Sequence, residues 1–260
     1  MFHLALESIA KTGSLAIFSD GEVLWHRAIG DSGRTAAEFA VVLDQALRWL
    51  ESQQQQLSFV SVAAGPGSFT GLRVGITTCK TLAYALKIPV MPVGTMIAIA
   101  CNAAIASEHE PASDSPGNAW QATHRFQVGV NAYRGQVFRA TFTGAELQQS
   151  EIKGRSATIC SRSEWDALVN QAVADQETVC ADAAILPKGD LPPGVSEIPK
   201  LLAIGVGVIA FRKLSSQSAA ADHPSLGLQV AQENELLIDP MKLTADYIKR
   251  SAAEEKADSR

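Results

Sequence analysis

The order of the expected strands and helices limits the possible folds of this chain more than any single motif does. Short apolar runs predict three strands within residues 3–29, and the turn Ser19-Asp20-Gly21 joins the second strand to the third. Apolar residues then recur at helical spacing from Thr35 to Leu50. The next elements are a strand over 57–64, a helix from Ser68 or Thr70 to about Leu86, a strand over 89–93 and a helix over 95–106. This half of the chain therefore starts with the order strand-strand-strand-helix-strand-helix.

The same order recurs in the second half. Two strands are expected over 126–131 and 136–142, and a third within Glu146 to Ile152. Ser163 is expected to cap a helix that reaches about Val173, and Val179 opens a short strand. A connection rich in proline and glycine over 187–199 then leads to a helix over 201–214. A βββαβα unit that occurs twice is typical of the duplicated, actin-like (ribonuclease-H-like) fold, so the predicted class is α/β with two lobes.

The polar segments between these units set the expected domain boundaries. Residues 1–106 would form the first lobe, 107–124 an exposed loop, 125–225 a second and smaller lobe, and 255–260 a solvated tail. A final helix near Pro240 to Glu254 is expected to return to the first lobe. With 260 residues, each lobe has enough chain for its own core.

Composition excludes several classes of protein. The chain is 47% hydrophobic and 19% charged, which argues against a disordered protein or a coiled coil. Its 27 acidic and 22 basic residues give a net charge of −5, which argues against binding nucleic acid through a basic surface of its own. No apolar stretch has the length of a membrane span, and residues 1–13 do not resemble a signal peptide, so we expect a cytoplasmic protein. The four cysteines form no CxxC pair.

A glycine-rich segment follows the strand at 57–64. Residues 65–75 read Gly-Pro-Gly-Ser-Phe-Thr-Gly-Leu-Arg-Val-Gly, between a buried strand and a helix, where glycine loops often bind phosphate. The segment matches neither the Walker A motif nor GxGxxG. Gly65 and Gly67 could simply form a tight turn, with Ser68 as the helix cap. Alternatively Gly65, Gly67 and Ser68, with Glu7 from the first strand, are weak candidates for nucleotide contact. We expect no bound cofactor.

Residues 65–76, continued by Ile88-Pro89-Val90, resemble the signature of the TsaB (YeaZ) family. These proteins are the non-catalytic partners in bacterial synthesis of threonylcarbamoyladenosine in tRNA. Residues 131–138 resemble the family's Asp-Ala-Arg-Arg-Gly-Glu-Val-Tyr hairpin. Tyr247-Ile248-Lys249-Arg250 with Ala253-Glu254 resembles its C-terminal Tyr-Leu-Arg…Ala-Glu. The family's fold is the duplicated actin-like one, in agreement with the element order.

The resemblance implies a helper subunit. It would bind and activate a TsaD-like transferase, which modifies the adenosine next to the anticodon in tRNAs that read codons beginning with adenine. A TsaE-like ATPase would be a further partner, tRNA would be reached only through the complex, and a homodimer could form when the transferase is absent. The alternative is an ATP-binding enzyme of the actin-like superfamily, such as a small kinase or a peptidase-like protein.

The chain departs from the family pattern at three positions. Glu7-Ser8-Ile9 stands where the first strand usually ends in Asp-Thr-Ser, Ala36 replaces a histidine, and Asn131 replaces an aspartate. Each departure loses or moves a group that could hold a metal or a phosphate. The TsaD-like enzymes carry an HxxxH pair on the first helix, whereas histidines here stand at 3, 26, 109, 124 and 223. We therefore expect no catalytic residue and no metal site.

The helices at 35–50 and 68–86 are the candidate partner interface. The first is apolar on nearly every side at its start, and the second combines large apolar residues with small ones that permit close helix packing. The expected contact residues are Ala36, Phe39, Ala40, Leu43, Phe69, Gly71, Leu72, Arg73, Gly75 and Ile76. Alternatively, the second lobe or the C-terminal helix covers this surface.

Overall fold

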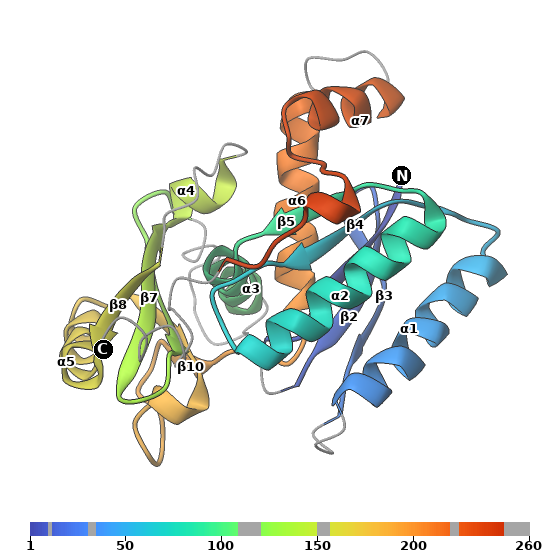
Figure 1. Ribbon diagram of the computed structural model, residues 1–260. Coiled ribbons are helices and arrows are strands. Elements are labelled where there is room, and N and C mark those ends of the chain that lie inside the picture. Colours follow the sequence, from blue (N-terminus) through green and yellow to red (C-terminus); the bar gives the residue numbers. More distant parts are fainter. Residues whose placement is uncertain (10–11, 31–34, 109–120, 150–156, 219–223, 247–260) are drawn as a thin grey trace, which may run out of the picture.

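Two five-stranded mixed sheets form the frame of the computed structural model (Figure 1). The structure describes residues 1–9, 12–30, 35–108, 121–149, 157–218 and 224–246. The first sheet has the order β3-β2-β1-β4-β5. Its strands are β1 (Phe2–Glu7), β2 (Ser14–Ser19), β3 (Glu22–Ala28), β4 (Leu57–Ala63) and β5 (Val90–Val93).

The second sheet repeats this arrangement, in the order β8-β7-β6-β9-β10. Its strands are β6 (Arg125–Asn131), β7 (Gln136–Thr143), β8 (Thr158–Ser161), β9 (Thr178–Ala181) and β10 (Val195–Glu197). In both sheets the first strand is central, antiparallel to the second and parallel to the fourth. The expected duplication of topology is therefore present.

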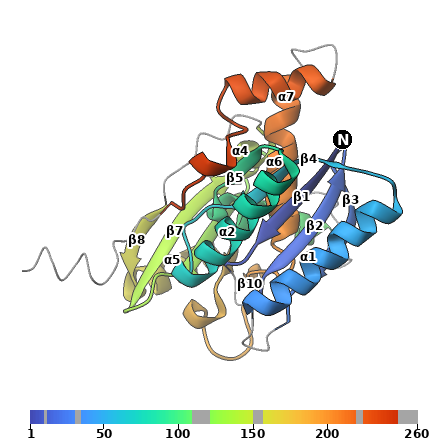
Figure 2. The ribbon, with the colours of Figure 1, turned by 45° about the vertical axis from the view of Figure 1, so that its right-hand side comes forward.

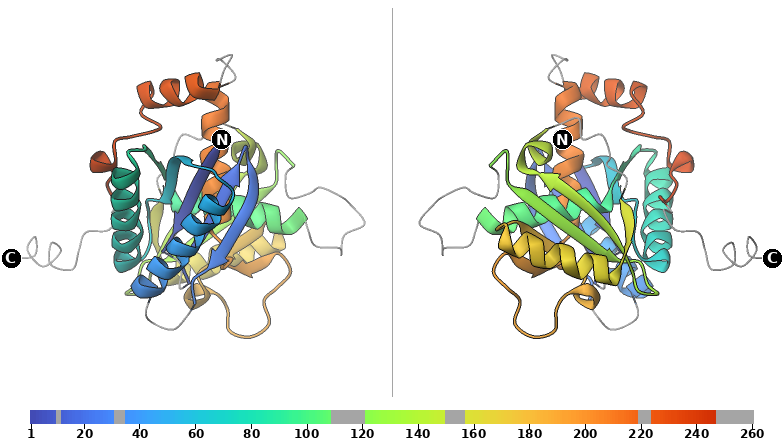
Figure 3. Two further views of the ribbon diagram at one scale, coloured as in Figure 1. Left: turned by 90° about the vertical axis from the view of Figure 1, so that its right-hand side faces the viewer. Right: turned by 90° about the vertical axis from the view of Figure 1, so that its left-hand side faces the viewer.

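Helices cover both faces of each sheet (Figures 1 and 2). The outer face of the first sheet carries α1 (Thr35–Ser52) and α2 (Phe69–Leu86), and its inner face carries α6 (Ala203–Ser218). The second sheet packs on α3 (Thr95–Glu108) inside and on α5 (Arg162–Ala174) outside (Figure 3). Because α3 and α6 also pack on each other, one apolar core runs through both halves.

Two expectations in the second lobe were wrong in detail. Residues 144–148 form the short helix α4 (Gly144–Gln148) instead of the third strand, because Thr143 and Glu146 make a capping box there. The third strand is β8, further along the chain. Helix α5 is capped by Ser161, two residues before the expected Ser163, since Ser161 forms the capping box with Glu164.

The segments after α5 also differ from expectation. The connection over 187–199 contains β10, and η1 (Ala183–Ile185) and α7 (Pro224–Glu233) were not predicted. The helix expected over 240–254 is absent from the described part: η2 (Pro240–Lys242) is a single 3₁₀ turn, and residues 243–246 are irregular. Residues 247–254, most of the loop at 107–124 and the tail at 255–260 lie outside the described residues.

The segment over 236–246 nevertheless packs on the first lobe. Ile238 pairs with Val90 of β5, and the N–H of Asp246 donates to the carbonyl of Ala64 at 2.7 Å. No helix in the described ranges is both long and apolar enough to cross a membrane.

Candidate functional site

The glycine-rich loop between β4 and α2 is held by contacts within the chain. Gly65 has φ +125°, and its N–H donates to Oγ1 of Thr95 at 3.1 Å. The N–H of Thr95 donates back to the carbonyl of Gly65 at 2.8 Å. A side chain at Gly65 would place its Cβ 2.6 Å from the carbonyl oxygen of Asp246. The C-terminal segment therefore lies directly against the loop.

The rest of the loop makes a turn and a helix cap. A Cβ at Gly67 would lie 1.8 Å from Cγ2 of Ile9, so the loop after β1 occupies the space beside it. The hydroxyl of Ser68 accepts the N–H of Gly71 at 3.3 Å, which confirms Ser68 as the cap of α2. These contacts correspond to the turn-and-cap interpretation of the glycine-rich segment.

Glu7, the fourth weak candidate for nucleotide contact, is fully buried at the end of β1. Its carboxylate accepts the N–H of Ile9 and, at 3.4 Å, the hydroxyl of Ser14. The Ser14 oxygen in turn accepts the N–H of Ala203, at the start of α6, at 2.9 Å. This chain of bonds ties the β1–β2 hairpin to α6. Within the described ranges, no group of three or more histidine, cysteine, aspartate or glutamate side chains could hold a metal ion.

The small-residue face of α2 is turned inward, which corrects part of the predicted interface. A Cβ at Gly71 would lie 2.1 Å from the carbonyl oxygen of Ser8, and one at Gly75 would lie 2.3 Å from its Oγ. That hydroxyl donates to the carbonyl of Gly71 at 2.7 Å. The two glycines thus let α2 pack closely on the loop after β1 and leave no room there for a helix of a partner.

Three large apolar members of the predicted set are also in the core: Phe39, Leu72 and Ile76. Phe39 is only 1% exposed, because α1 packs on β2 and β3 through this side chain. Leu72 and Ile76 lie on the side of α2 that faces the sheet. The sequence pattern showed that both helices were rich in apolar residues but did not separate the side facing the sheet from the outer side.

Helices α1 and α2 lie over the same face of the first sheet (Figures 1 and 2). Ala40, Phe69 and Arg73 are exposed and Leu43 is half-buried, whereas the side chain of Ala36 lies outside the described part. Val41, which was not among the expected contacts, is 58% exposed. We call Ala40, Val41, Leu43, Phe69 and Arg73 the outer patch. The sequence feature that could have identified Val41 as a contact residue is an apolar side chain next to Ala40, on the side of the helix away from Phe39.

Phe69 and Arg73 are one helical turn apart and contact each other. The Arg73 guanidinium carbon lies 5.6 Å from the centroid of the Phe69 ring, within the range of a cation–π interaction. The ring is still 52% exposed. This pair presents an aromatic surface and a positive charge together at the start of α2.

Asn131, the third departure from the family pattern, shapes the β6–β7 turn. Its Oδ1 accepts the N–H of Tyr133 at 2.9 Å. Tyr133 and Arg134 have φ angles of 59° and 54°, which non-glycine residues seldom adopt. In the described structure the Asn131 amide therefore supports a tight turn.

Sequence matches to known proteins cover part of the chain. The family model described as TsaD, tRNA N6-adenosine threonylcarbamoyltransferase, matches residues 34–120. The TsaB protein of Bacillus subtilis is 50% identical over 48 residues, which are 18% of this chain and 21% of that protein. The TsaB protein of Escherichia coli is 29% identical over 97 residues, which cover 37% of this chain and 42% of that protein. The chain thus matches less than half the length of either relative.

The fold match covers nearly the whole chain. A solved structure of YeaZ from Pseudomonas aeruginosa superimposes with a TM-score of 0.61 at 16% identity, covering 95% of this chain and 99% of that one. At this identity the likeness establishes the fold alone, and it agrees with the predicted duplicated actin-like class. The TsaB sequence matches, the TsaD family model and the YeaZ-like fold together support assignment of this chain to the TsaB/YeaZ family.

Proposed function

We propose that this protein is a helper subunit in the synthesis of threonylcarbamoyladenosine in tRNA, and that it acts by binding a TsaD-like transferase. The observation that carries the proposal is the outer patch on α1 and α2. It lies within residues 34–120, which the family model matches, and it exposes apolar side chains, with Arg73 beside Phe69.

The chemistry of the outer patch suits a protein interface. Aromatic residues and arginine dominate the binding energy of many interfaces, and Phe69 with Arg73 provides both at one place. A helix pair on the partner could pack along α1 and α2 and bury Val41 and Phe69. Because pairing of like surfaces is the commonest oligomeric arrangement, a second copy of this chain could occupy the patch when the transferase is absent.

The proposed role is assistance and not catalysis. Helix α1 contains no histidine, and Ala36 stands where the resemblance would place one. The transferase would therefore supply the chemistry, a TsaE-like ATPase would join the complex, and tRNA would be contacted only through the complex. In this role the chain acts in the cytoplasm.

The alternative, an ATP-binding enzyme, has less support. The loop over 65–68 is packed against Ile9 and Asp246, and Ser68 is engaged as a helix cap. The Glu7 carboxylate accepts hydrogen bonds from the chain's own Ile9 and Ser14. These contacts favour a structural role for the four candidate nucleotide-binding residues.

The test is a calorimetric titration of the protein against a TsaD-like transferase. Phe69→Ala and Val41→Asp should each weaken binding by tenfold or more, since loss of a central interface contact typically costs about 2 kcal/mol. Ile159→Ala, an exposed apolar position on β8 of the second sheet, is the matched control and should leave the affinity unchanged. Threonylcarbamoyladenosine formation with the complete set of subunits should fall in parallel.

Two results would contradict the proposal. One is a transferase affinity that neither substitution in the outer patch changes. The other is ATP turnover by the isolated chain, with no detectable complex with the transferase, which would favour the alternative enzyme.

A further inference from the structure

One outward side of α2 carries a row of residues that runs the length of the helix. The row consists of Phe69, Arg73, Thr77, Lys80 and Tyr84. With 3.6 residues per turn, these positions fall within about 80° of one another around the helix axis. Lys80 is half-buried and the others are exposed, Tyr84 by 67%. Their intervals of four and three residues are those at which one helix packs along another, and we call the five residues the α2 row.

The charges of α2 have a single sign. The helix contains Arg73 and Lys80 and no aspartate or glutamate. Neither cation forms an ion pair with a described residue. The two positions are seven residues apart, which is about 10 Å along the axis. The α2 row therefore presents two positive charges that the described part of the chain does not neutralise.

Arginines on the other two outer helices are neutralised within their own helix. On α1 the Nε of Arg48 lies 2.6 Å from Oδ2 of Asp44, and on α5 the Nε of Arg162 lies 2.7 Å from a carboxylate on the next turn. Arg73 instead lies over the ring of Phe69. An aromatic ring attracts a cation but accepts none of the conventional hydrogen bonds that a guanidinium donates. The ring thus helps to hold the Arg73 side chain while its N–H donors stay open to another molecule.

A partner that covers the α2 row needs an acidic surface. A charge removed from water without a counter-charge is strongly destabilising, so Arg73 and Lys80 each require an acceptor in such a complex. A carboxylate supplies it, and with arginine it forms two parallel hydrogen bonds. A second copy of α2 packed on this row would place cations against cations. An acidic partner is therefore the complementary one.

Phosphate groups are also anionic, but the surroundings favour a protein over a nucleic acid. Helix α1 lies over the same face of the sheet and carries exposed carboxylates at Asp44 and Glu51, which would repel a phosphate backbone. The chain as a whole has a net charge of −5. The intervals of four and three residues also match a helix as the occupant.

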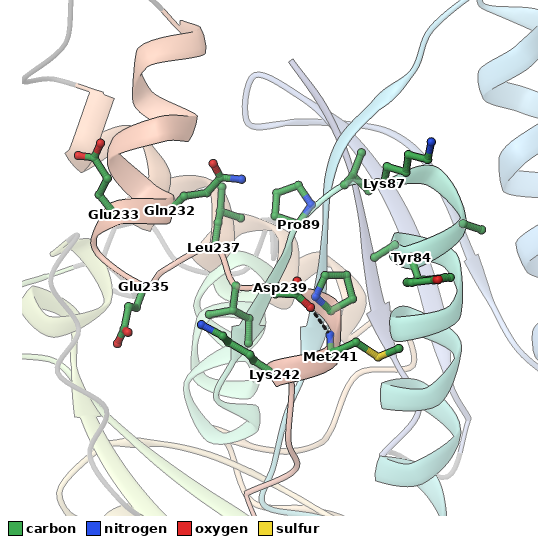
Figure 4. Close-up of a pocket in the computed structure, with 15 residues that line it drawn as sticks. Tyr84, Lys87, Pro89, Gln232, Glu233, Glu235, Leu237, Asp239, Met241 and Lys242 are labelled. Carbon is green, nitrogen blue, oxygen red and sulfur yellow. Dashed lines mark hydrogen bonds between the residues drawn. The ribbon is translucent and has the colours of Figure 1, made fainter.

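At its C-terminal end the α2 row borders a groove of about 860 Å³ (Figure 4). Tyr84 and Lys87 belong to the α2 wall of this groove, and residues 232–242 form the opposite wall. Met241 on the opposite wall is 66% exposed, and its side chain extends towards α2 below Tyr84 (Figure 4). The α2 wall thus adds a third cation and no acid. Tyr84 and Met241 offer an apolar contact at the end of the row.

We propose that the α2 row binds an acidic helix of the partner. Two carboxylates about seven residues apart on that helix face Arg73 and Lys80, and an apolar side chain enters the groove beside Tyr84. The inference rests on the function proposed above, because the partner is taken to be the TsaD-like transferase. It adds the charge of the partner's contact helix and extends the contact from the outer patch to the far end of α2. Pairing of opposite charges chiefly sets the choice of partner and the association rate.

Carbodiimide cross-linking tests the inference directly, because it joins an amine to a carboxylate in contact with it. In the complex with the transferase, Lys80 should be linked to an aspartate or glutamate of the transferase. Arg73→Lys keeps the charge and adds a second amine. It should give a second link, about seven residues from the first in the transferase sequence. Lys188, an exposed lysine in the second half of the chain, is the matched control and should give no link.

Charge reversal measures the contribution to affinity. The double variant Arg73→Glu with Lys80→Glu should bind the transferase about thirtyfold or more weakly at about 50 mM salt. The difference should become small at about 500 mM salt, where charges are screened beyond roughly 4 Å. Lys188→Glu is the same reversal outside the α2 row and should change the affinity less than about threefold. Circular dichroism checks that both variants fold, and the salt dependence of the unmodified chain needs no variant.

Three outcomes would overturn the inference. The first is a complex that Val41→Asp weakens but that charge reversal and salt leave unchanged, in which case the proposed function would stand without the acidic helix. The second is a concentration-dependent dimer of this chain that the double reversal abolishes. The third is binding of tRNA by the isolated chain that the double reversal abolishes. Absence of any complex with the transferase would contradict the proposed function itself, and this inference with it.

Discussion

The two sheets of this protein have the same strand order but different outer cover. In the first sheet, the fourth and fifth strands are connected by α2, a helix of 18 residues. In the second, the corresponding connection from β9 to β10 contains only the three-residue turn η1. The second sheet therefore has a single long helix, α5, on its outer face, whereas the first has both α1 and α2.

This difference shows where the duplicated fold has room for a binding surface. The strand order places an apolar core between the two sheets, and residues of both halves contribute to that core. The additional helix of the first half, α2, supplies Phe69 and Arg73 of the outer patch. The outer patch therefore depends in part on the element that the second half lacks.

Removing one half altogether is the strongest test of this comparison. The inner face of the first sheet is covered by α6 from the second half, and the second sheet packs on α3 from the first. A fragment ending at residue 115 should therefore fail to fold, because its inner apolar face would be exposed. Circular dichroism and amide exchange would show this, and co-expression with residues 116–260 should restore the fold. A fragment that folds alone would show that the halves are independent.

The next largest loss of stability is expected from a substitution in α5, the single outer helix of the second sheet. Trp165 of α5 is fully buried, and its Nε1 donates to the carbonyl of Ile185 at 3.1 Å. Trp165→Ala should lower the free energy of unfolding by about 3 to 5 kcal/mol, through the loss of buried area and the cavity left behind. Urea denaturation measures this value. Tyr133→Ala, which removes an exposed ring at the tip of the same sheet, is the control and should change it little.

A smaller effect is expected where α2 approaches the first sheet. A Cβ at Gly75 would lie 2.3 Å from Oγ of Ser8, so Gly75→Ala should destabilise the fold by about 1 to 3 kcal/mol by overpacking. Thr77→Ala, at an exposed position on the same helix, is the matched control. Thermal unfolding of the two variants gives the comparison. Equal stabilities would show that the loop after β1 can move away from α2 at little cost.

The order of elements in the first half, and the strands β6, β7 and β9 of the second, could be predicted from sequence because each of these elements has a strong local pattern. The predicted helix and strand positions were wrong where a helix N-cap decided the local structure, as at Thr143 and Ser161. The short strand β10 was missed because it lies inside a connection rich in proline and glycine. A capping box is a local interaction between residues three positions apart, so the one at Thr143 and Glu146 is enough to start a short helix in a weak apolar run.

The candidate interface was less predictable, for a physical reason. Whether Gly75 faces a partner or Ser8 depends on which side of α2 packs on the sheet, and apolar residues lie on more than one side of that helix. The pairing of Ile238 with Val90 was beyond prediction, because the two residues lie nearly 150 positions apart in the chain.

The smallest expected change in the free energy of unfolding concerns the buried polar residues of the two central strands, β1 and β6. Gln127 of β6 has hydrogen-bond partners in Glu177 and Thr141. His3 of β1 is fully buried between the rings of Phe18 and Phe59, at centroid distances of 4.8 and 4.5 Å, and its ring also approaches the backbone of Gly207 on α6. Burial lowers the pKa of His3 from 6.5 to about 3, so the ring is neutral in the folded protein at physiological pH.

This lowered pKa predicts that the free energy of unfolding depends on pH, and burial also lowers the pKa of His124 beside the second sheet, in the same direction. Below pH 6.5 the unfolded chain takes up a proton at His3 and the folded chain does not, so the free energy of unfolding falls with pH until about pH 3. At pH 5 the loss relative to pH 7 should be about 2 kcal/mol. His3→Phe, which keeps the stacking, should remove this loss, whereas His26→Gln on the exposed strand β3 should retain it. Urea denaturation at pH 7 and pH 5 compares the three proteins, and an unchanged pH dependence in His3→Phe would mean that His3 is protonated within the folded core.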